Sequence, residues 1–189
     1  MGTYKYGLIK GLPIGLGYLA VSFAFGVMCI NGGITPLMAT IISFTNLTSA
    51  GQFAGMKLIL EVASYLEIAL TVLLINLRYS LMSLSLSQKI DTNSKTINRL
   101  LDSLSITDEI YAIAITEKKK VTTPYLLGLT TLPLLGWTLG TLLGATISQI
   151  FPENLLTAMN ISLYAMFIAI VVPDAKKNKN VLVYCVYFY

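Results

Sequence analysis

Histidine is absent from the sequence, which removes the side chain most often used as a general base and as a metal ligand. Cysteine is scarce: Cys29 and Cys185 lie far apart and form no C-x-x-C motif. Charged residues make up only 12% of the 189 residues, against roughly 25% in soluble domains. These shortages argue against a metal site, against thiol redox chemistry and against a soluble globular protein.

Several other activities lack their usual sequence signals. The net charge of +4 is small and the lysines lie between apolar runs, unlike the basic surface of a nucleic-acid-binding protein. No P-loop is present, so transport driven by nucleotide hydrolysis is not indicated. No apolar run carries the carboxylate pair or the serine–lysine arrangement of an intramembrane hydrolase. We therefore expect a protein that is not an enzyme, binds no nucleic acid and needs no cofactor.

Apolar sequence, in contrast, is abundant. Hydrophobic residues make up 55% of the chain, and they cluster in runs of about 20 residues, the length that a helix needs to cross a bilayer. We predict one all-α integral membrane domain over 1–189, a multi-span helical bundle with spans at 12–30, 66–86, 125–150 and 155–172. The apolar run 181–189 has about half the length of a span and predicts a partial last helix.

Residues 37–60 form an apolar zone with a polar middle, which reads Thr-Asn-Leu-Thr-Ser-Ala-Gly-Gln over 45–52. Such a run is unusual for a lipid-facing helix. Non-helical backbone at membrane depth survives only where protein or a water-filled cavity surrounds it. The zone is therefore predicted to be a broken or re-entrant segment, with a full crossing as the alternative.

The positions of lysine and arginine favour the re-entrant alternative, because cytoplasmic loops collect these residues. If 37–60 crosses the membrane, nine cations from Lys89 onward lie outside, and only Lys5, Lys10 and Lys57 lie inside. If the zone enters and leaves on one side, eleven cations lie inside and Lys57 alone lies outside, with Arg78 within a span. The second count fits the rule far better.

Residues 89–123 form the only long polar stretch, and we predict a cytoplasmic segment that contains a short amphipathic helix. Asp108 and Glu109 precede an apolar run within it. Carboxylates stabilise the first turn of a helix, and Ser105 with Asp108 has the spacing of a capping box. The alternative is that Asp108 and Glu109 form a cytoplasmic gate. The pattern leaves both interpretations open.

A weak internal echo links two of the predicted spans. Residues 12–18 and 132–137 both read Leu-Pro, a short spacer, then glycine and an aromatic residue. Transporters are often built from internal repeats. Chance similarity between two apolar helices is an equally good explanation, so the echo remains a hypothesis.

The polar middle of 37–60 supplies the first candidate binding residues: Asn46, Ser49, Gly51 and Gln52. A helix that starts inside the membrane near Ser49 offers free backbone N–H groups and a positive dipole end, which suit a carboxylate. Gly51 lets a ligand or another backbone approach closely. The alternative is a polar contact between helices, with serine and threonine as hydrogen-bonding partners.

Asn76 and Arg78 are the second pair of candidate binding residues, because both lie in the apolar run 66–86. Polar and ionisable groups inside a membrane usually face a cavity or a partner. Arg78 could bind an anionic group or pair with Asp108 or Glu109. It could also extend to the lipid surface, since it lies about two turns from the end of the run. Both alternatives stay open.

An ordered set of short motifs resembles a known family, the AzlC family, over about residues 7–173. The set comprises Gly17-Tyr18, Phe25-Gly26, Ala50-Gly51-Gln52-Phe53, the run Asn76–Met82, Thr107-Asp108-Glu109, Gly136-Trp137 and the run Ala165–Ala169 before Pro173. AzlC proteins are the large subunits of bacterial branched-chain amino acid exporters. The resemblance implies a multi-pass protein of the bacterial inner (plasma) membrane. It also implies export of valine, leucine, isoleucine and, in some members, methionine, together with a small hydrophobic AzlD-type subunit.

The sequence departs from the family pattern in two places. A denser polar run, 43–52, stands where the family has small residues, which leaves the substrate open. Family members also continue for one or two spans beyond Pro173, so we expect this chain to be truncated. The function we predict is secondary export of branched-chain amino acids with the small subunit. The alternatives are a membrane scaffold or assembly subunit and a channel, and a scaffold does not need the polar run. The amino acid carried, the coupling ion and the stoichiometry do not follow from the sequence.

Overall fold

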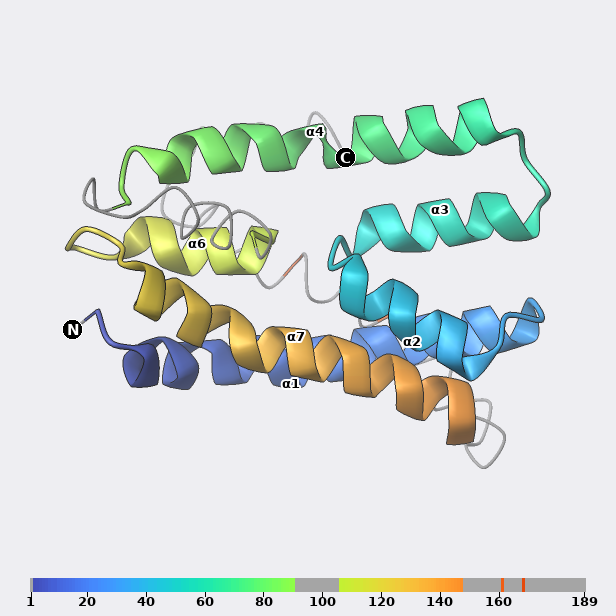
Figure 1. The fold of residues 1–189 in the computed structure, drawn as a ribbon, viewed down its shortest axis with the longest axis horizontal. Helices are drawn as coiled ribbons and strands as arrows, with labels where there is room; N and C mark the ends of the chain where they lie inside the picture. Colours follow the sequence, from blue (N-terminus) through green and yellow to red (C-terminus); the bar gives the residue numbers. More distant parts are fainter. Residues whose placement is uncertain (1, 91–105, 148–160, 162–167, 169–189) are drawn as a thin grey trace.

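A computed structural model describes residues 2–90, 106–147, 161 and 168 (Figure 1). Within these residues the chain is all-α, and only an isolated bridge between Ile90 and Val121 has strand-like pairing. The helices are α1 (Tyr4–Asn31), α2 (Pro36–Thr45), α3 (Ala50–Leu60), α4 (Tyr65–Ser87), α6 (Asp108–Thr116) and α7 (Thr123–Ile147). Of these, α1, α4 and α7 are long and apolar enough to cross a membrane. The predicted fold class, an all-α membrane bundle with a broken segment, is confirmed.

The predicted spans compare with these helices as follows. For the expected span 12–30 the structure has α1, for 66–86 it has α4, and for 125–150 it has α7. The expected span 155–172 and the partial helix 181–189 lie outside the described residues, apart from two isolated positions in the former.

Helices α1 and α7 pack against each other in parallel along most of their length. A Cβ atom on Gly7 would overlap the backbone of Tyr125, and one on Gly26 would overlap the backbone of Thr141. Early residues of α1 thus meet early residues of α7, and late residues meet late ones. Small residues that bring backbones into contact are the usual basis of helix packing in membranes. We call the end of the bundle where α1 and α7 begin the near end, and the opposite end the far end.

Helices α2 and α3 form a hairpin that does not cross the bundle. It starts at the far end, where Thr35 caps α2 and Pro36 occupies its first turn. The chain turns back after Thr45, and α3 returns to the far end (Figure 1). There, a Cβ atom on Gly32 would collide with the side chain of Leu60. Both ends of the hairpin therefore lie at the same end of the bundle, as the re-entrant interpretation of 37–60 requires.

Helix α4 crosses the bundle, and α6, like α3, begins in its middle (Figure 1). Helix α4 runs from the far end to the near end (Figure 1). Helix α6 begins deep in the bundle and also ends at the near end, where the backbone N–H of Val121 donates to the carbonyl of Lys89 at 3.0 Å. The segment predicted as cytoplasmic, 89–123, thus contains a helix that runs inside the bundle. Its apolar residues Ile110 and Ala114 explain the difference, because both are fully buried.

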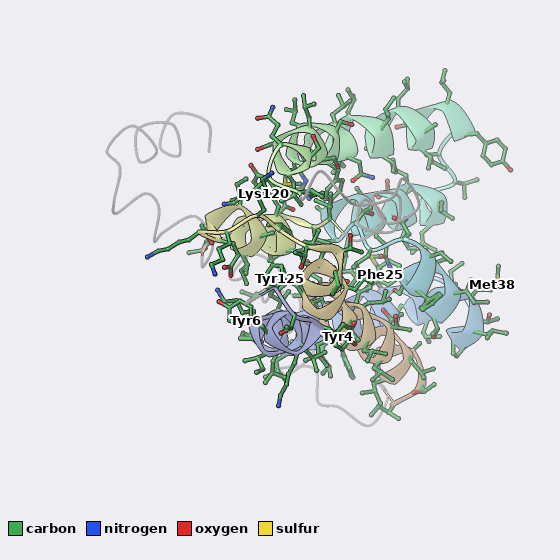
Figure 2. The ribbon with its side chains drawn as sticks, turned by 60° about the vertical axis from the view of Figure 1, so that its left-hand side comes forward. Tyr4, Tyr6, Phe25, Met38, Lys120 and Tyr125 are labelled. Carbon is green, nitrogen blue, oxygen red and sulfur yellow. The ribbon has the colours of Figure 1, made fainter. Side chains whose placement is uncertain are left out.

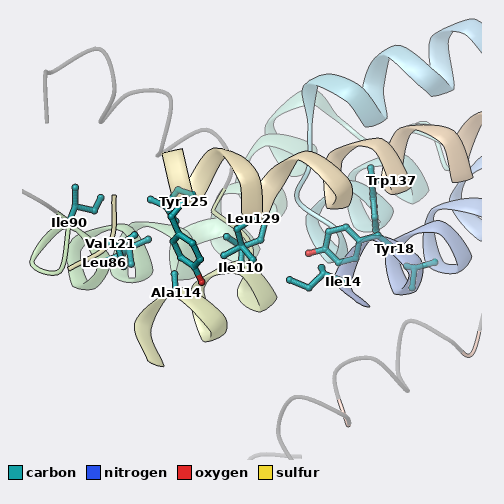
Figure 3. Close-up of a cluster of buried hydrophobic side chains, with 12 residues drawn as sticks. Ile14, Tyr18, Leu86, Ile90, Ile110, Ala114, Val121, Tyr125, Leu129 and Trp137 are labelled. Atoms are coloured by element: carbon teal, nitrogen blue, oxygen red, sulfur yellow. The ribbon is translucent and has the colours of Figure 1, made fainter. Parts of the chain in front are cut away.

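The larger core cluster lies between α1, α6, α7 and the end of α4, where buried side chains follow the helix contacts from the near end to the middle (Figure 3). Tyr18 and Trp137 close this cluster with an edge-to-face contact, their ring centroids 5.1 Å apart. A second cluster, around Phe25, Cys29 and Met56, joins α1 to the α2–α3 hairpin. Helix α4 differs, because none of the residues in its most apolar stretch is buried. Its exposed leucines suit a surface that faces lipid or another subunit.

Candidate functional site

The start of α3 lies at the middle of the bundle, where a chain of polar side chains ties it to α2 and α7. Gln52 donates from Nε2 to Ser43 Oγ at 2.7 Å, and Ser43 Oγ lies 2.6 Å from Thr141 Oγ1. Trp137 donates from Nε1 to Gln52 Oε1 at 3.0 Å. These groups are buried, so each hydrogen bond avoids the penalty of an unsatisfied polar atom. Gln52 therefore holds the hairpin in place.

Ser49 is the N-cap residue of α3, but its side chain makes no capping hydrogen bond. Its φ of 48° lies in the left-handed region, which is strained for a residue other than glycine. The side chain is 4% exposed, and Oγ has no hydrogen-bond partner among the described residues. The first turn of α3 thus carries a positive dipole end without a side-chain cap. Asn46 does not supply one, because its Oδ1 accepts from Thr48 Oγ1 at 2.8 Å.

Gly51 brings α3 into close contact with α4. A Cβ atom at this position would lie 2.5 Å from Asn76 Oδ1, which is buried and has no hydrogen-bond partner in the described part of the chain. Two residues predicted separately as binding residues, Gly51 and Asn76, are therefore neighbours. The close approach of Gly51 is to a side chain of the protein itself, rather than to an open space for a ligand.

Arg78 pairs with Asp108 across α4 and α6, with 3.1 Å between NH2 and Oδ2. This is one of the two acidic partners that the sequence allowed. The guanidinium also lies 3.5 Å from the hydroxyl of Tyr79, which donates to the carbonyl of Thr48 at 3.1 Å. Arg78 is therefore directed into the protein, where it connects the start of α6 to the turn before α3. The structure favours the pairing interpretation over extension toward lipid.

Glu109 lies in the first turn of α6, against α1. Tyr18 donates a hydrogen bond to Glu109 Oε2 and lies 2.7 Å from Thr107 Oγ1. Thr107 caps α6, since its Oγ1 accepts from the backbone N–H of Ile110 at 3.4 Å. Glu109 is 8% exposed, and its other oxygen, Oε1, has no hydrogen-bond partner among the described residues. The capping role predicted for this segment falls to Thr107, and Glu109 lies deep between helices rather than at a surface.

The two tyrosines reveal an inverted relation between α1–α3 and α4–α6. Tyr18 is the fifteenth residue of α1, and Tyr79 is the fifteenth residue of α4. Tyr18 contacts the N-cap of α6, and Tyr79 contacts the residue just before the N-cap of α3. Helix α1 therefore contacts the start of α6, and α4 contacts the turn before α3. Because α1 and α4 run in opposite directions, the two halves resemble each other with inverted topology.

The first turns of the two short helices extend this relation. The second residue after the N-cap meets the opposite half: Gly51 lies against Asn76, and Glu109 against Tyr18. The fourth residue is aromatic in both and contacts its own half. Phe53 packs 5.3 Å from Phe25 between ring centroids, and the hydroxyl of Tyr111 lies 2.9 Å from Ser85 Oγ. The halves differ in charge, because α3 has no acidic residue in its first turn and α6 has two.

A second polar cluster lies at the near end, away from these residues. Lys10 pairs with Glu117 at 2.8 Å, and the hydroxyls of Tyr6 and Tyr125 donate to the same carboxylate oxygen. These side chains, with Lys118–Lys120, line a cavity of about 340 Å³. Figure 2 labels Tyr6, Lys120 and Tyr125 among them. The hydrogen bond from Lys10 lowers the pKa of Glu117 below its ordinary value of 4.5. None of the predicted binding residues lines this cavity.

Sequence reasoning missed the side chains that hold the site together. These are Tyr18, Ser43, Tyr79, Thr107, Trp137 and Thr141. A usable signal existed for Tyr18, Tyr79 and Trp137, because a buried tyrosine or tryptophan usually finds a hydrogen-bond partner. Their partners come from distant parts of the chain, so the pairs could not be assigned. The role of Asp108 and Glu109 as a cytoplasmic gate stays a prediction.

These features define a class: the protein is a multi-pass α-helical membrane protein with short helices that begin in the middle of the bundle. Within that class, the sequence profile of the AzlC family, described as AzlC protein, matches residues 13–151. The chain belongs to the AzlC family.

Curated proteins with similar sequences are also membrane proteins. A membrane protein from Archaeoglobus fulgidus, uncharacterized by its name, is 27% identical over 175 residues, 92% of this chain and 76% of that protein. A similarly named protein from Helicobacter pylori is 26% identical, over 94% of this chain and 78% of its own length. The inner membrane protein YgaZ from Escherichia coli is 26% identical over 139 residues, 71% of this chain and 57% of YgaZ. No solved structure matches this chain.

Proposed function

We propose that the protein is a secondary transporter subunit that exports branched-chain amino acids across the cell membrane. The observation that carries the proposal is the start of α3, a helix end inside the bundle without a side-chain cap, bordered by polar atoms of Ser49 and Asn76 that have no hydrogen-bond partner among the described residues. Discontinuous helices with such ends form the substrate sites of many secondary transporters. Membership of the AzlC family supports a role in transport, and the substrate class is the one that the sequence resemblance implies, valine, leucine and isoleucine.

The substrate's two charged groups are both assigned to the surroundings of the α3 start. The carboxylate is assigned to the backbone N–H groups of Ser49, Ala50 and Gln52, where the dipole of α3 is positive and no acidic side chain competes. The N–H of Gly51 already donates to the carbonyl of Thr48 at 3.1 Å. Asn76 Oδ1, which faces Gly51, is an acceptor for the ammonium group. The apolar side chain is assigned to the nearby aromatic pair Phe25 and Phe53, with Phe23 as a neighbour on α1.

Transport requires the contacts at the middle of the bundle to open. Arg78 and Asp108 join α4 to α6, while Tyr79 joins α4 to the turn before α3. We propose that the α2–α3 hairpin opens toward the far end and α6 toward the near end, in alternation. The inverted relation of the halves supports this, because related halves give two states of similar energy with the site between them.

The family resemblance also supplies a proposed partner, a small hydrophobic AzlD-type subunit. The exposed apolar surface of α4, which includes Leu73, Leu77 and Leu81, is where we propose that it docks. A surface that faces lipid has the same composition, so the experiment must decide. Co-purification of the two chains in mild detergent supports the complex, and a monodisperse single chain that transports leucine contradicts it.

The export function is tested with labelled leucine. Cells loaded with leucine should release it faster when this chain and the small subunit are produced together than with either alone. Liposomes with the purified pair should exchange leucine for leucine but not for lysine, which carries a second positive charge. A pair that inserts and assembles but moves no branched-chain amino acid contradicts the proposal, and favours a scaffold or assembly role.

A further inference from the structure

The acidic residues at the start of α6 differ in their charge partners. Asp108 is paired with Arg78 at 3.1 Å. Glu109 is buried, with 8% of its surface exposed, yet it forms no ion pair among the described residues. Its Oε2 accepts from Tyr18, and its Oε1 has no hydrogen-bond partner in the part of the chain that the structure describes. Glu109 is thus a buried carboxyl group with one oxygen unused and no cation beside it.

A carboxyl group in this setting is far less costly to bury when it is neutral. An unpaired carboxylate away from water carries a large desolvation penalty, which protonation removes. The titratable and charged groups around Glu109 provide no cation that would neutralise its carboxylate in place of a proton. Helix α1 supplies Tyr18, α4 supplies Arg78 and Tyr79, and α6 supplies Asp108. Only Arg78 among these is positive, and it is engaged by Asp108.

The position of Glu109 connects its proton to the movement proposed above. The Tyr18 hydroxyl has one proton, which it donates to Glu109 or to Thr107. Both acceptors lie at the start of α6, so the hydrogen bond to Glu109 exists only while α6 packs against α1. When α6 moves toward the near end, Glu109 loses that donor and meets water. A hydrated carboxyl group releases its proton at neutral pH. The group regains a proton in the other half of the cycle, when the α2–α3 hairpin opens and water reaches the middle of the bundle from the far end.

We propose that Glu109 is the coupling-proton site of the transporter, a role that rests on the proposed export function. In the outward-facing state a proton from water bonds to Oε1, and in the inward-facing state that O–H bond breaks and the proton passes to cytoplasmic water. One proton moves inward as one zwitterionic amino acid moves outward, with no change in oxidation state. A proton fits better than a metal cation, because hard metal cations take several oxygen ligands and Glu109 offers one unused oxygen.

The test uses Glu109→Gln in liposomes with the small subunit, because glutamine resembles a permanently protonated glutamate. The variant should retain leucine-for-leucine exchange, which needs no proton release. Leucine export driven by a pH gradient should fall to the level of empty liposomes. Glu67→Gln, at an exposed acid in the first turn of α4, is the matched control and should keep both activities. Wild-type pH-driven export by Glu109→Gln overturns the proposal. Loss of exchange as well overturns it in favour of a site for the substrate's ammonium group.

A second measurement does not depend on the substrate. A protonated buried carboxyl group gives an infrared carbonyl band that shifts in D2O and is absent from Glu109→Gln. Tyr18→Phe, which keeps Glu109 but removes its donor, should shift this band, and it replaces the first variant if Glu109→Gln does not fold. Absence of the band in the wild type overturns the proton site. If the band is present but no leucine moves, the export function fails while the proton site stands.

Discussion

Arg78 has a role at the residue scale that depends on the shape of its side chain. The guanidinium contacts Asp108, the Tyr79 hydroxyl and the face of the Tyr79 ring, 5.2 Å from its centroid. A planar fork can make these contacts at once, and an ammonium cannot. A role as a snorkelling cation would require only charge and length.

We therefore predict that Arg78→Lys keeps membrane expression but loses most export, roughly tenfold, because the ion pair survives without the tyrosine contacts. Arg78→Leu should lose all export, because Asp108 is left without its cation. Export rates are compared at equal amounts of inserted protein. Wild-type export by the lysine variant would reduce Arg78 to a charge that sets the topology.

Gly51 and Gly17 form a matched pair for a second residue-scale prediction. A Cβ atom on Gly51 would lie 2.5 Å from Asn76 Oδ1, whereas one on Gly17 would meet nothing within 4 Å. Gly51→Leu should abolish export in a protein that still inserts, because α3 is forced away from α4, and overpacking costs about 1–3 kcal/mol. Gly17→Leu should export normally. The measurement is leucine efflux with detergent thermal stability alongside, and equal behaviour of the two variants contradicts the packing argument.

At the scale of elements, the near-end cluster attaches the start of α1 to the α6–α7 junction. Glu117 accepts from Lys10, Tyr6 and Tyr125, and Thr122 donates to the carbonyl of Gly2 at 2.6 Å. Two helices, α1 and α7, are thus bound to one carboxylate at the end of α6. This attachment depends on pH because the pKa of Glu117 is lowered in the folded protein.

The sign of the pH effect follows from that lowered pKa. The contribution of Glu117 is complete above its ordinary pKa of 4.5 and is lost as the pH falls through the lower, folded value. Hydrogen exchange of the backbone at residues 4–10 should therefore be slow near neutral pH and faster below that value, after correction for the intrinsic rate. Glu117→Gln should remove this pH dependence. The same acid response in the glutamine variant would show that another group is responsible.

At the scale of the whole molecule, part of the architecture follows from sequence alone. The hairpin α2–α3 could be predicted. A polar run within an apolar zone indicates a break in the helix, and so do the positions of the cations. The depth of α6 could not, because its burial depends on Tyr18 and on packing against α1 and α7. The surrounding polar sequence gives no sign of it. The binding residues on 46–52 and Asn76 do meet, but Gly51 meets the protein rather than open space.

The internal repeat shows a similar limit. The echo between 12–18 and 132–137 falls on two helices that are parallel and in contact, and its aromatic residues Tyr18 and Trp137 pack edge to face. The symmetry of the fold is instead the inverted relation between the half α1–α3 and the half α4–α6. Only a few positions, such as Tyr18 and Tyr79, keep the same residue there. The two halves surround different helix ends, so their sequences have little reason to remain alike.

The topology of the whole molecule is the last prediction. If the near end is cytoplasmic, Lys57 faces the outside and Lys119 faces the cytoplasm. The sequence predicts that Pro152 faces the outside and Lys95 the cytoplasm, and both lie outside the described residues. The geometry agrees with the cation count, because Lys10 and Lys118–Lys120 border one cavity at the near end. Lys57 instead lies near the end of α3, at the far end, paired with Glu61 at 3.9 Å.

Single cysteines at these four positions, in a chain without Cys29 and Cys185, would be exposed to an impermeant thiol reagent outside intact cells. Positions 57 and 152 should react, and positions 95 and 119 should react only after the cells are permeabilised. Because Lys57 and Lys119 lie at opposite ends of the bundle, a chain inserted as proposed cannot expose both to the outside. Labelling of position 119 in intact cells would therefore invert the topology or require 37–60 to cross, and it would reverse the direction assigned to the proton at Glu109.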